Sequence, residues 1–89
     1  MAREIRDSVV VITGASSGIG RATALEFARD GARLVLSARN RSALKETAGE
    51  CKDLGAETLV VQTDVGDEDQ VERLARKAVD QFGRIDVWV

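Results

Sequence analysis

The 89-residue sequence predicts an α/β fold in which helices cover both faces of a doubly wound parallel sheet. Three features lead to this prediction. Four short runs rich in β-branched residues alternate with three segments whose apolar residues recur at helical spacing. The first run, residues 9–13, is apolar almost throughout, as is typical of a strand buried on both faces of a parallel sheet. The connections between the runs are short, as expected for strand–helix–strand units.

The first half of the chain predicts two strands with a helix between them. After the strand over residues 9–13, the helix is expected over residues 18–30, because its apolar residues share one face: Ala24, Leu25 and Ala28. Gly31 is expected to end this helix, since glycine readily adopts the left-handed conformation found there. The second strand is then expected over residues 33–38.

The second helix is expected to begin after Asn40 or Ser42, both of which are favourable N-cap residues, and to stop at Gly55. Its buried face is expected to consist of apolar residues three or four positions apart: Leu44, Ala48, Cys51 and Leu54. Residues 58–63 are expected to form the third strand.

The third helix has a strong start signal. Asp67 is expected as its N-cap with Gln70 three residues later, which is a variant of the capping box. The buried face is expected to contain five residues: Val71, Leu74, Ala75, Ala78 and Phe82. Gly83 closes this helix, residues 85–89 begin a fourth strand, and Trp88 is expected in the core.

Right-handed crossovers determine how these elements are arranged. Strands one, two and three step in one direction, so the first two helices cover one face of the sheet. A fourth strand beside strand one places the third helix on the other face, and the sheet order is 3-2-1-4. Because that face carries only one helix, we expect the chain to be part of a longer polypeptide. The alternative is a complete four-stranded miniature protein.

The composition argues against several classes of function. A net charge of −2 and the absence of tyrosine provide neither a basic surface nor a stacking platform for nucleic acid. The single cysteine, Cys51, cannot form an internal disulfide, and without histidine no metal site is expected. Its position on an apolar stripe predicts a buried structural thiol. The N-terminal residues do not resemble a signal peptide and no apolar run is long enough to span a bilayer, so we expect a cytoplasmic protein without membrane contact.

Three glycines lie between the first strand and the first helix. Gly14 is expected to let the chain leave the strand in a tight turn, Gly18 to let backbone amides approach a phosphate, and Gly20 to let the helix pack against the sheet. The helix N-terminus adds unpaired amides and a positive partial charge, and Ser16 and Ser17 add hydroxyl donors. The loop therefore predicts a phosphate site. The alternative is a tight turn with incidental glycines. The spacing G-x-x-x-G-x-G fits neither G-x-G-x-x-G nor the P-loop pattern.

The loop segment TGASSGIG resembles the T-G-x-x-x-G-I-G motif of the short-chain dehydrogenases/reductases. Two further segments match the family pattern, the pair Asp64-Val65 and the run IDVWV at residues 85–89. The resemblance extends from about Asp7 to the last residue. It implies a Rossmann-type domain of an NAD(P)-dependent oxidoreductase, with residues 1–89 as its N-terminal part.

The resemblance also implies roles for particular residues. Ile19 belongs to the cofactor-binding loop. The Asp64 carboxylate is expected to accept a hydrogen bond from the adenine amino group, with the backbone of Val65 beside it. The alternative for Asp64 is a solvated acid near the start of the third helix.

The end of the second strand indicates which dinucleotide is bound. An NAD site needs a carboxylate there for the ribose hydroxyls, and the sequence offers no acid before Glu46. Arg39 can instead donate to the 2′-phosphate of NADP, with Ser37 and Asn40 as helpers. We therefore expect NADP(H), with NAD as the alternative. Members of the family that prefer NADP often carry a second basic residue in the loop, where this chain has Ser17. The alternative for Arg39 is a surface arginine that caps a loop.

The family resemblance implies a catalytic Tyr-x-x-x-Lys pair with an upstream serine, and this chain contains no tyrosine. No catalytic residue is therefore assigned. We expect the NADP(H)-binding part of a short-chain oxidoreductase that transfers hydride between the nicotinamide and a carbonyl or alcohol substrate, as a homo-oligomer when intact. One alternative is a stand-alone, non-catalytic dinucleotide-binding module. Another is a methyltransferase using S-adenosylmethionine, which would favour an acid where Arg39 stands.

Overall fold

The structure is a computed structural model and describes residues 5–89. The residues before these, on which the expectation of no signal peptide depends, lie outside the described part. Four parallel strands form one sheet in the order β3-β2-β1-β4, as predicted. The strands are β1 (Val9–Ile12), β2 (Arg33–Ala38), β3 (Thr58–Gln62) and β4 (Val87–Trp88), and the helices are α1 (Gly18–Arg29), α2 (Arg41–Asp53) and α3 (Glu68–Phe82).

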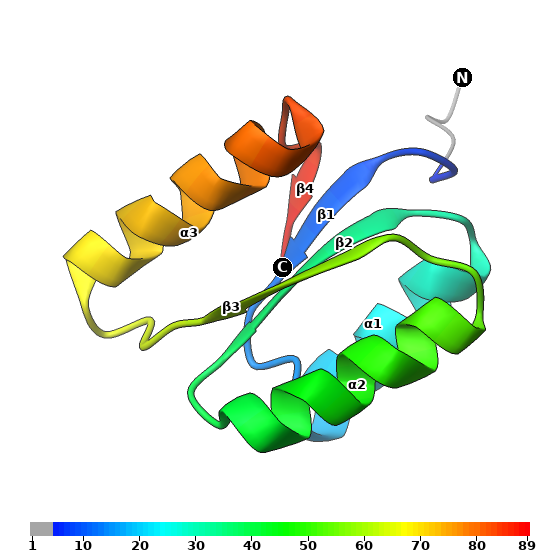
Figure 1. Cartoon of the computed structure of the whole chain (residues 1–89), viewed down its shortest axis with the longest axis horizontal. Helices are drawn as coiled ribbons and strands as arrows, with labels where there is room; N and C mark the ends of the chain where they lie inside the picture. Colours follow the sequence, from blue (N-terminus) through cyan, green and yellow to red (C-terminus); the bar gives the residue numbers. More distant parts are fainter. Residues whose placement is uncertain (1–4) are drawn as a thin grey trace.

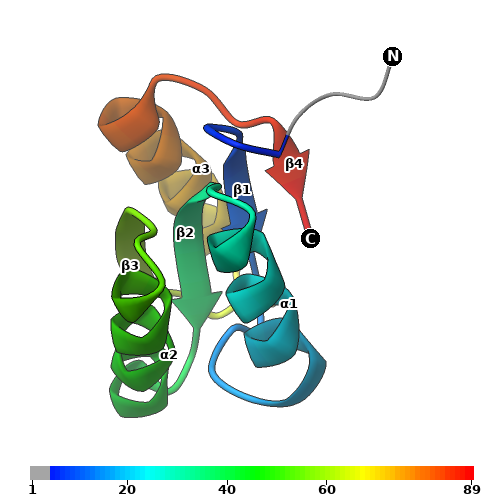
Figure 2. The same ribbon diagram turned by 90° about the vertical axis from the view of Figure 1, so that its right-hand side faces the viewer.

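The helices cover the two faces of the sheet unequally. Figures 1 and 2 show α1 and α2 side by side on one face and α3 on the opposite face, as the crossover rule predicts. All four residues of β1 are buried because this strand lies inside the sheet between two layers of helix. Within residues 5–89 no helix is long and apolar enough to cross a membrane.

Two separate apolar cores hold the layers together. The larger core joins β1 and β2 to α1 and α2 and is centred on residues such as Ile12, Leu34 and Leu44. The smaller core lies between the sheet and α3, where Leu74 and Ala78 are the only fully buried residues of that helix. Alternate residues of β1 therefore point into different cores, as expected for a strand with covered faces.

Several expected positions in these cores were wrong. Leu54 is 42% exposed because α2 has already ended, and the buried face of α2 includes Thr47 in its place. Trp88 is also 42% exposed, since no helix within residues 5–89 covers it on the edge strand β4. β2 has the predicted bounds, whereas β1, β3 and β4 each end one residue earlier than predicted. Thr13 and Thr63 lie beyond the assigned strands, although their amides still bond to the neighbouring segments.

A buried acid fixes the last strand to the first. The Asp86 carboxylate, whose side chain is only 6% exposed, accepts a hydrogen bond from the Val9 amide at 2.8 Å and one from Arg84 Nε at 2.9 Å. The Asp86 amide in turn donates to the Val9 carbonyl at 2.9 Å. The sequence pattern gave no indication of this role, because it depends on two segments that are far apart in the chain.

Candidate functional site

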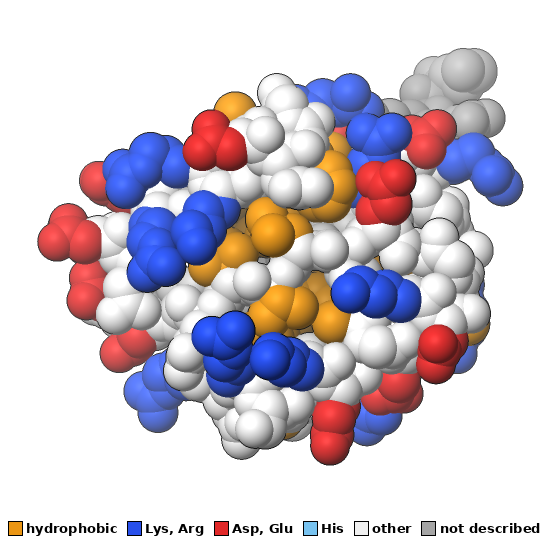
Figure 3. Space-filling model, viewed as in Figure 1, with side chains coloured by type: hydrophobic (Ala, Val, Ile, Leu, Met, Phe, Trp, Pro, Cys, Tyr) orange, Lys and Arg blue, Asp and Glu red, His pale blue; other side chains and the backbone are white. Residues whose placement is uncertain are grey.

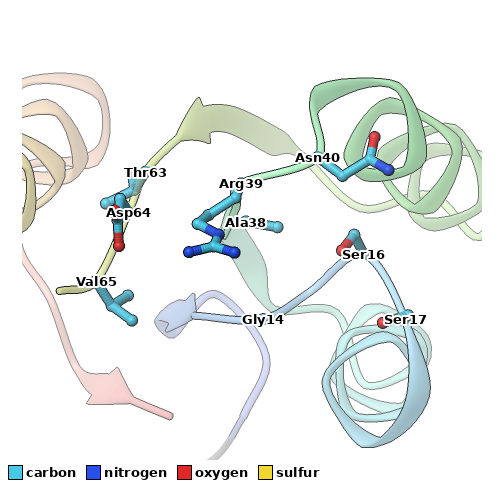
Figure 4. Close-up of a pocket in the computed structure, with 9 residues that line it drawn as sticks. All are labelled: Gly14, Ser16, Ser17, Ala38, Arg39, Asn40, Thr63, Asp64 and Val65. Carbon is cyan, nitrogen blue, oxygen red and sulfur yellow. The ribbon is translucent and has the colours of Figure 1, made fainter.

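A cavity of about 460 Å³ opens where β1, β2 and β3 end. Carboxyl ends of parallel strands are the usual place for ligands in open α/β sheets. Figure 4 shows the residues that line it, contributed by the loop after β1, the end of β2 and the segment after β3: Gly14, Ser16, Ser17, Ala38, Arg39, Asn40, Thr63, Asp64 and Val65. The site is thus assembled from three segments that are separated in the sequence.

The glycine loop adopts a conformation that requires two of its glycines. Gly14 has φ +63° and Gly18 has φ +57°, values that side-chain-bearing residues rarely adopt. A Cβ at Gly18 would meet no heavy atom within 4 Å, so the space beside this residue is open. The amide of Ala15 donates to the Ser37 carbonyl at 3.0 Å, and this bond fastens the loop to β2.

Gly20 has a different role from the one predicted. A Cβ at this position would lie 2.0 Å from the carbonyl oxygen of Gly14 and 3.3 Å from the Cα of Ala15. The first turn of α1 therefore packs against the backbone of its own loop rather than against the sheet. The close packing that the prediction gave to Gly20 is present, but its partner is the loop backbone rather than the sheet.

The start of α1 offers uncapped hydrogen-bond donors. The N-cap residue Ser17 makes no side-chain capping bond, whereas Asn40 caps α2 and Asp67 caps α3. The first amides of any helix lack partners within it, so those of Gly18 and Ile19 are available to a ligand. The Ser16 and Ser17 side chains line the cavity beside them. Anions bind at such helix termini because amides and the helix dipole act together.

Arg39 carries the positive charge of the cavity. Figure 4 shows its guanidinium group pointing into the cavity, between the glycine loop and Asp64. The backbone carbonyl of Arg39 accepts a hydrogen bond from Gln62 Nε2 at 2.9 Å, which fixes the chain at this point. No ion pair of its side chain is found within residues 5–89. The Asn40 Oδ1 atom accepts from the Ala43 amide at 3.1 Å, and the side-chain NH₂ group of Asn40 remains as a donor.

Asp64 is held from three directions. Its Oδ1 atom accepts a hydrogen bond from the Gly66 amide at 2.9 Å, and its amide donates to Gln70 Oε1 at 2.8 Å. Its carbonyl accepts from the Asp67 amide at 3.0 Å. In a standard capping box Gln70 would contact the Asp67 amide, so the predicted box is modified. Here Gln70 links the start of α3 to Asp64 and orients it.

The remaining predicted residues are distributed as follows. Ser37 is fully buried and does not line the cavity, so a direct helper role toward a phosphate is not supported for it. Ile19 is 87% exposed and does not line the cavity. Val65 lines the cavity with an exposed side chain. Two lining residues, Ala38 and Thr63, were missed. Position at a strand end was the signal that could have identified them.

The chain has neither histidine nor tyrosine, and no set of three or more metal-ligating side chains occurs within residues 5–89. Burial, and then the adjacent Glu50 carboxylate, raises the pKa of the Cys51 thiol, which lies in the core as predicted. The polar groups that the cavity does offer include the Arg39 guanidinium, the Asp64 carboxylate and the hydroxyls of the two loop serines.

Comparison with known proteins identifies the family. The sequence pattern of the family described as short chain dehydrogenase matches residues 8–89. This chain belongs to the short-chain dehydrogenase family. It is 49% identical over 87 residues to the uncharacterized oxidoreductase YxnA of Bacillus subtilis and 43% identical over 84 residues to 11-beta-hydroxysteroid dehydrogenase A of Sesamum indicum. These matches cover 98% and 93% of this chain and 24% of each relative.

Solved structures show the same fold. A short-chain dehydrogenase/reductase from Burkholderia phymatum, in complex with NAD, aligns with a TM-score of 0.94 and 40% identity over 98% of this chain and 31% of its own. A hydroxysteroid dehydrogenase from Escherichia coli aligns with a TM-score of 0.90 and 32% identity, covering 96% of this chain and 37% of its own. The short-chain dehydrogenase chain described here thus spans about a quarter to a third of the length of these relatives.

Proposed function

We propose that this chain is the NADP(H)-binding part of a short-chain oxidoreductase that transfers hydride between the nicotinamide and a carbonyl or alcohol substrate. The observation that carries the proposal is the single cavity that joins a glycine loop, an unpaired arginine and an oriented aspartate. Residues 1–89 would form the N-terminal part of one nucleotide-binding domain. Support for this division comes from the relatives, of which the chain covers about a quarter.

The cavity fits the adenosine and phosphate end of such a cofactor. Uncapped amides at Gly18 and Ile19, with the open space beside Gly14 and Gly18, would hold the pyrophosphate. Asp64 and the Val65 backbone would bind the adenine edge. The cofactor supplies the hydride chemistry when bound, and this part of the chain supplies binding and orientation. Homo-oligomerisation of the intact enzyme and a cytoplasmic location stay predictions.

Preference for NADP over NAD depends on Arg39. A guanidinium group matches the geometry of a phosphate and can donate two hydrogen bonds to it, whereas a carboxylate would repel it. The end of β2 offers Arg39 and Asn40 to the cavity and no acid. One relative was solved with NAD. We therefore take the residue at this position, rather than the fold, as the expected determinant of the preference for NADP.

Calorimetric titration of the protein with NADP⁺ and NAD⁺ tests this assignment. We expect Arg39→Asp to weaken NADP⁺ binding by about tenfold or more, since hydrogen bonds to charged groups contribute about 1.5–3 kcal/mol, and to reverse the ratio of the two dissociation constants. Arg41→Asp carries the same charge change two residues further on and should leave the ratio nearly unchanged. An unaltered ratio in the Arg39 variant would refute the assignment.

A further inference from the structure

The free edge of the sheet has features that the cofactor site does not explain. β3 is an edge strand (Figure 1). The Glu57 carbonyl accepts a hydrogen bond from β2, and the Thr63 amide donates one to β2. Backbone polar groups alternate sides along a strand of a parallel sheet. Glu57 and Thr63 face β2, so every second residue counted from them does so too. The amide and carbonyl groups of the other residues point away from β2, and these residues are Thr58, Val60 and Gln62. No other strand within residues 5–89 pairs with this side of β3.

Two hollows lie along this edge. One of about 430 Å³ lies between β3 and α2, the other of about 220 Å³ between β3 and α3, and they share Arg41 and Val60. We call these two hollows the β3 groove. Every charged side chain that lines it is basic: Arg41, Lys45 and Lys52 from α2, and Arg73 and Lys77 from α3. Figure 3 shows Lys and Arg side chains on two sides of a central group of hydrophobic side chains.

This concentration of positive charge is local. The whole chain has a net charge of −2, with 15 acidic and 13 basic residues. The ion pairs found within residues 5–89 belong to other arginines: Arg21, Arg29, Arg33 and Arg84. The five basic residues of the β3 groove therefore keep their charge unpaired in the described structure, and their potentials add over a short length of surface.

The floor of the groove is apolar. Leu59 and Val60 are partly exposed, and they alternate between the two faces of β3. Val60 packs against the larger core, and Leu59 against the smaller core. The Thr58 hydroxyl, which lines the hollow beside α2, is buried and has no hydrogen-bond partner among the described residues. The groove thus combines an unpaired strand edge, apolar surface and a basic rim.

We propose that the β3 groove binds an extended acidic segment of a partner protein, which adds a strand to the edge of β3. Main-chain hydrogen bonds to an exposed strand edge give affinity, and side chains at alternate positions give specificity. In the partner segment, every second residue would be apolar and would contact the floor of the β3 groove. The acidic residues between them would face the basic side chains at its rim. This proposal is independent of the cofactor. No residue of the groove lines the cavity of the candidate functional site. Only Arg73 and Gln62 reach the neighbouring hollow of about 420 Å³, which also contains Arg39 and Asp64.

A fluorescent peptide in which glutamate and valine alternate is the direct probe, with a lysine–valine peptide as its counterpart. We expect the fluorescence anisotropy of the acidic peptide to rise when the protein is added, and that of the basic peptide to stay unchanged. Added salt should weaken the binding of the acidic peptide. Amide signals in the NMR spectrum of the protein should shift most at Thr58, Val60 and Gln62. Absence of binding at low salt, or shifts confined to other strands, would overturn the proposal.

Charge-reversal variants show whether peptide binding depends on the basic residues of the β3 groove or only on the net charge of the protein. The pair Lys45→Glu and Lys77→Glu changes one residue on each rim and should weaken peptide binding by about tenfold or more, because charges across an interface govern partner choice. The control pair Arg29→Glu and Arg76→Glu makes the same change of net charge outside the groove and should bind nearly as tightly as the original protein. An equal loss of peptide affinity in both double variants would contradict an acidic peptide as the occupant. The proposal would also be contradicted if a single-stranded oligonucleotide bound more tightly than the peptide, or if two copies of the chain paired through β3.

Discussion

Single residues determine whether the glycine loop can adopt its conformation, and Gly20 is the most restricted of them. A methyl group at this position would lie 2.0 Å from the Gly14 carbonyl oxygen, a distance that backbone atoms cannot relieve without moving the loop. We expect Gly20→Ala to lower the free energy of unfolding by about 1–3 kcal/mol, the usual cost of overpacking, and to weaken dinucleotide binding. Urea unfolding and calorimetry measure the two effects.

Gly49 provides the matched control for that change. It lies inside α2, where an added Cβ meets no heavy atom within 4 Å. Alanine is favoured over glycine in a helix interior by about 0.5–1 kcal/mol. Gly49→Ala should therefore stabilise the protein and leave dinucleotide binding unchanged. A Gly20 variant that is as stable and binds as well as the Gly49 variant would disprove the close contact.

Cys51 gives the fold a pH dependence at the alkaline end. Burial is the main cause that raises the pKa of its thiol, and Glu50 adds to it. The folded state therefore holds the thiol proton more tightly than the unfolded state does. Its contribution to stability is complete below the ordinary pKa of a thiol and is lost as the pH rises above it.

We expect the free energy of unfolding in urea to fall as the pH rises above about 8.5, the pH near which an unperturbed thiol titrates. The fall should be smaller in Cys51→Ala, which lacks the titrating group. Parallel pH profiles for the two proteins would show that the thiol is not the cause.

The helices differ in whether a side chain caps the free amides of their first turn. Asn40 caps α2, and Asp67 caps α3 by accepting from the amides of Asp69 and Gln70 at 3.0 and 3.3 Å. Ser17 leaves α1 without a side-chain cap. Removing a cap from α2 or α3 costs stability, whereas the uncapped α1 retains donors for a phosphate.

At the start of α3 the same side chain serves the helix and the site. Gln70 contacts the Asp64 amide and, through Nε2, the Asp67 carboxylate at 3.2 Å. Gln70→Ala should weaken dinucleotide binding several-fold, because Asp64 loses the bond that orients it. Gln81→Ala, at the exposed end of the same helix, is the control and should bind normally. Calorimetric titration measures both, and equal affinities would exclude an orienting role.

The sequence predicted the elements well and their long-range contacts poorly. All strands and helices, the sheet order and most helix ends followed from apolar spacing and from glycines such as Gly31 and Gly83, because these signals are local. Seven of the eleven residues predicted for the site line the cavity, since strand ends meet at one edge of a parallel sheet. The buried Ser37, the exposed Trp88 and the link from Gln70 to Asp64 could not be predicted, because each depends on which segments pack together.

In the molecule as a whole, the helices on the two faces of the sheet are buried to different extents. Four residues of α2 are buried, whereas only two residues of α3 are: Leu74 and Ala78. A salt bridge between Arg21 and Glu50 further joins α1 to α2. Helices with less buried apolar surface open at a lower free energy than the rest of a domain.

Hydrogen exchange of the 89-residue chain should therefore show α3 exchanging faster than α2. The amides of β1, which are covered on both faces, should be the slowest. Equal protection of the two helices would indicate that the chain opens only as a whole. Leu74→Ala should increase the difference between the helices, because it removes the main apolar anchor of α3.

The most direct test of the account is an NMR titration of the protein with NADP⁺. If the uncapped start of α1 binds the pyrophosphate, the amide signals of Gly18, Ile19 and Gly20 will shift most, together with the Nε signal of Arg39. Binding that leaves these amides unchanged, or no binding of either nicotinamide dinucleotide, would contradict the central claim.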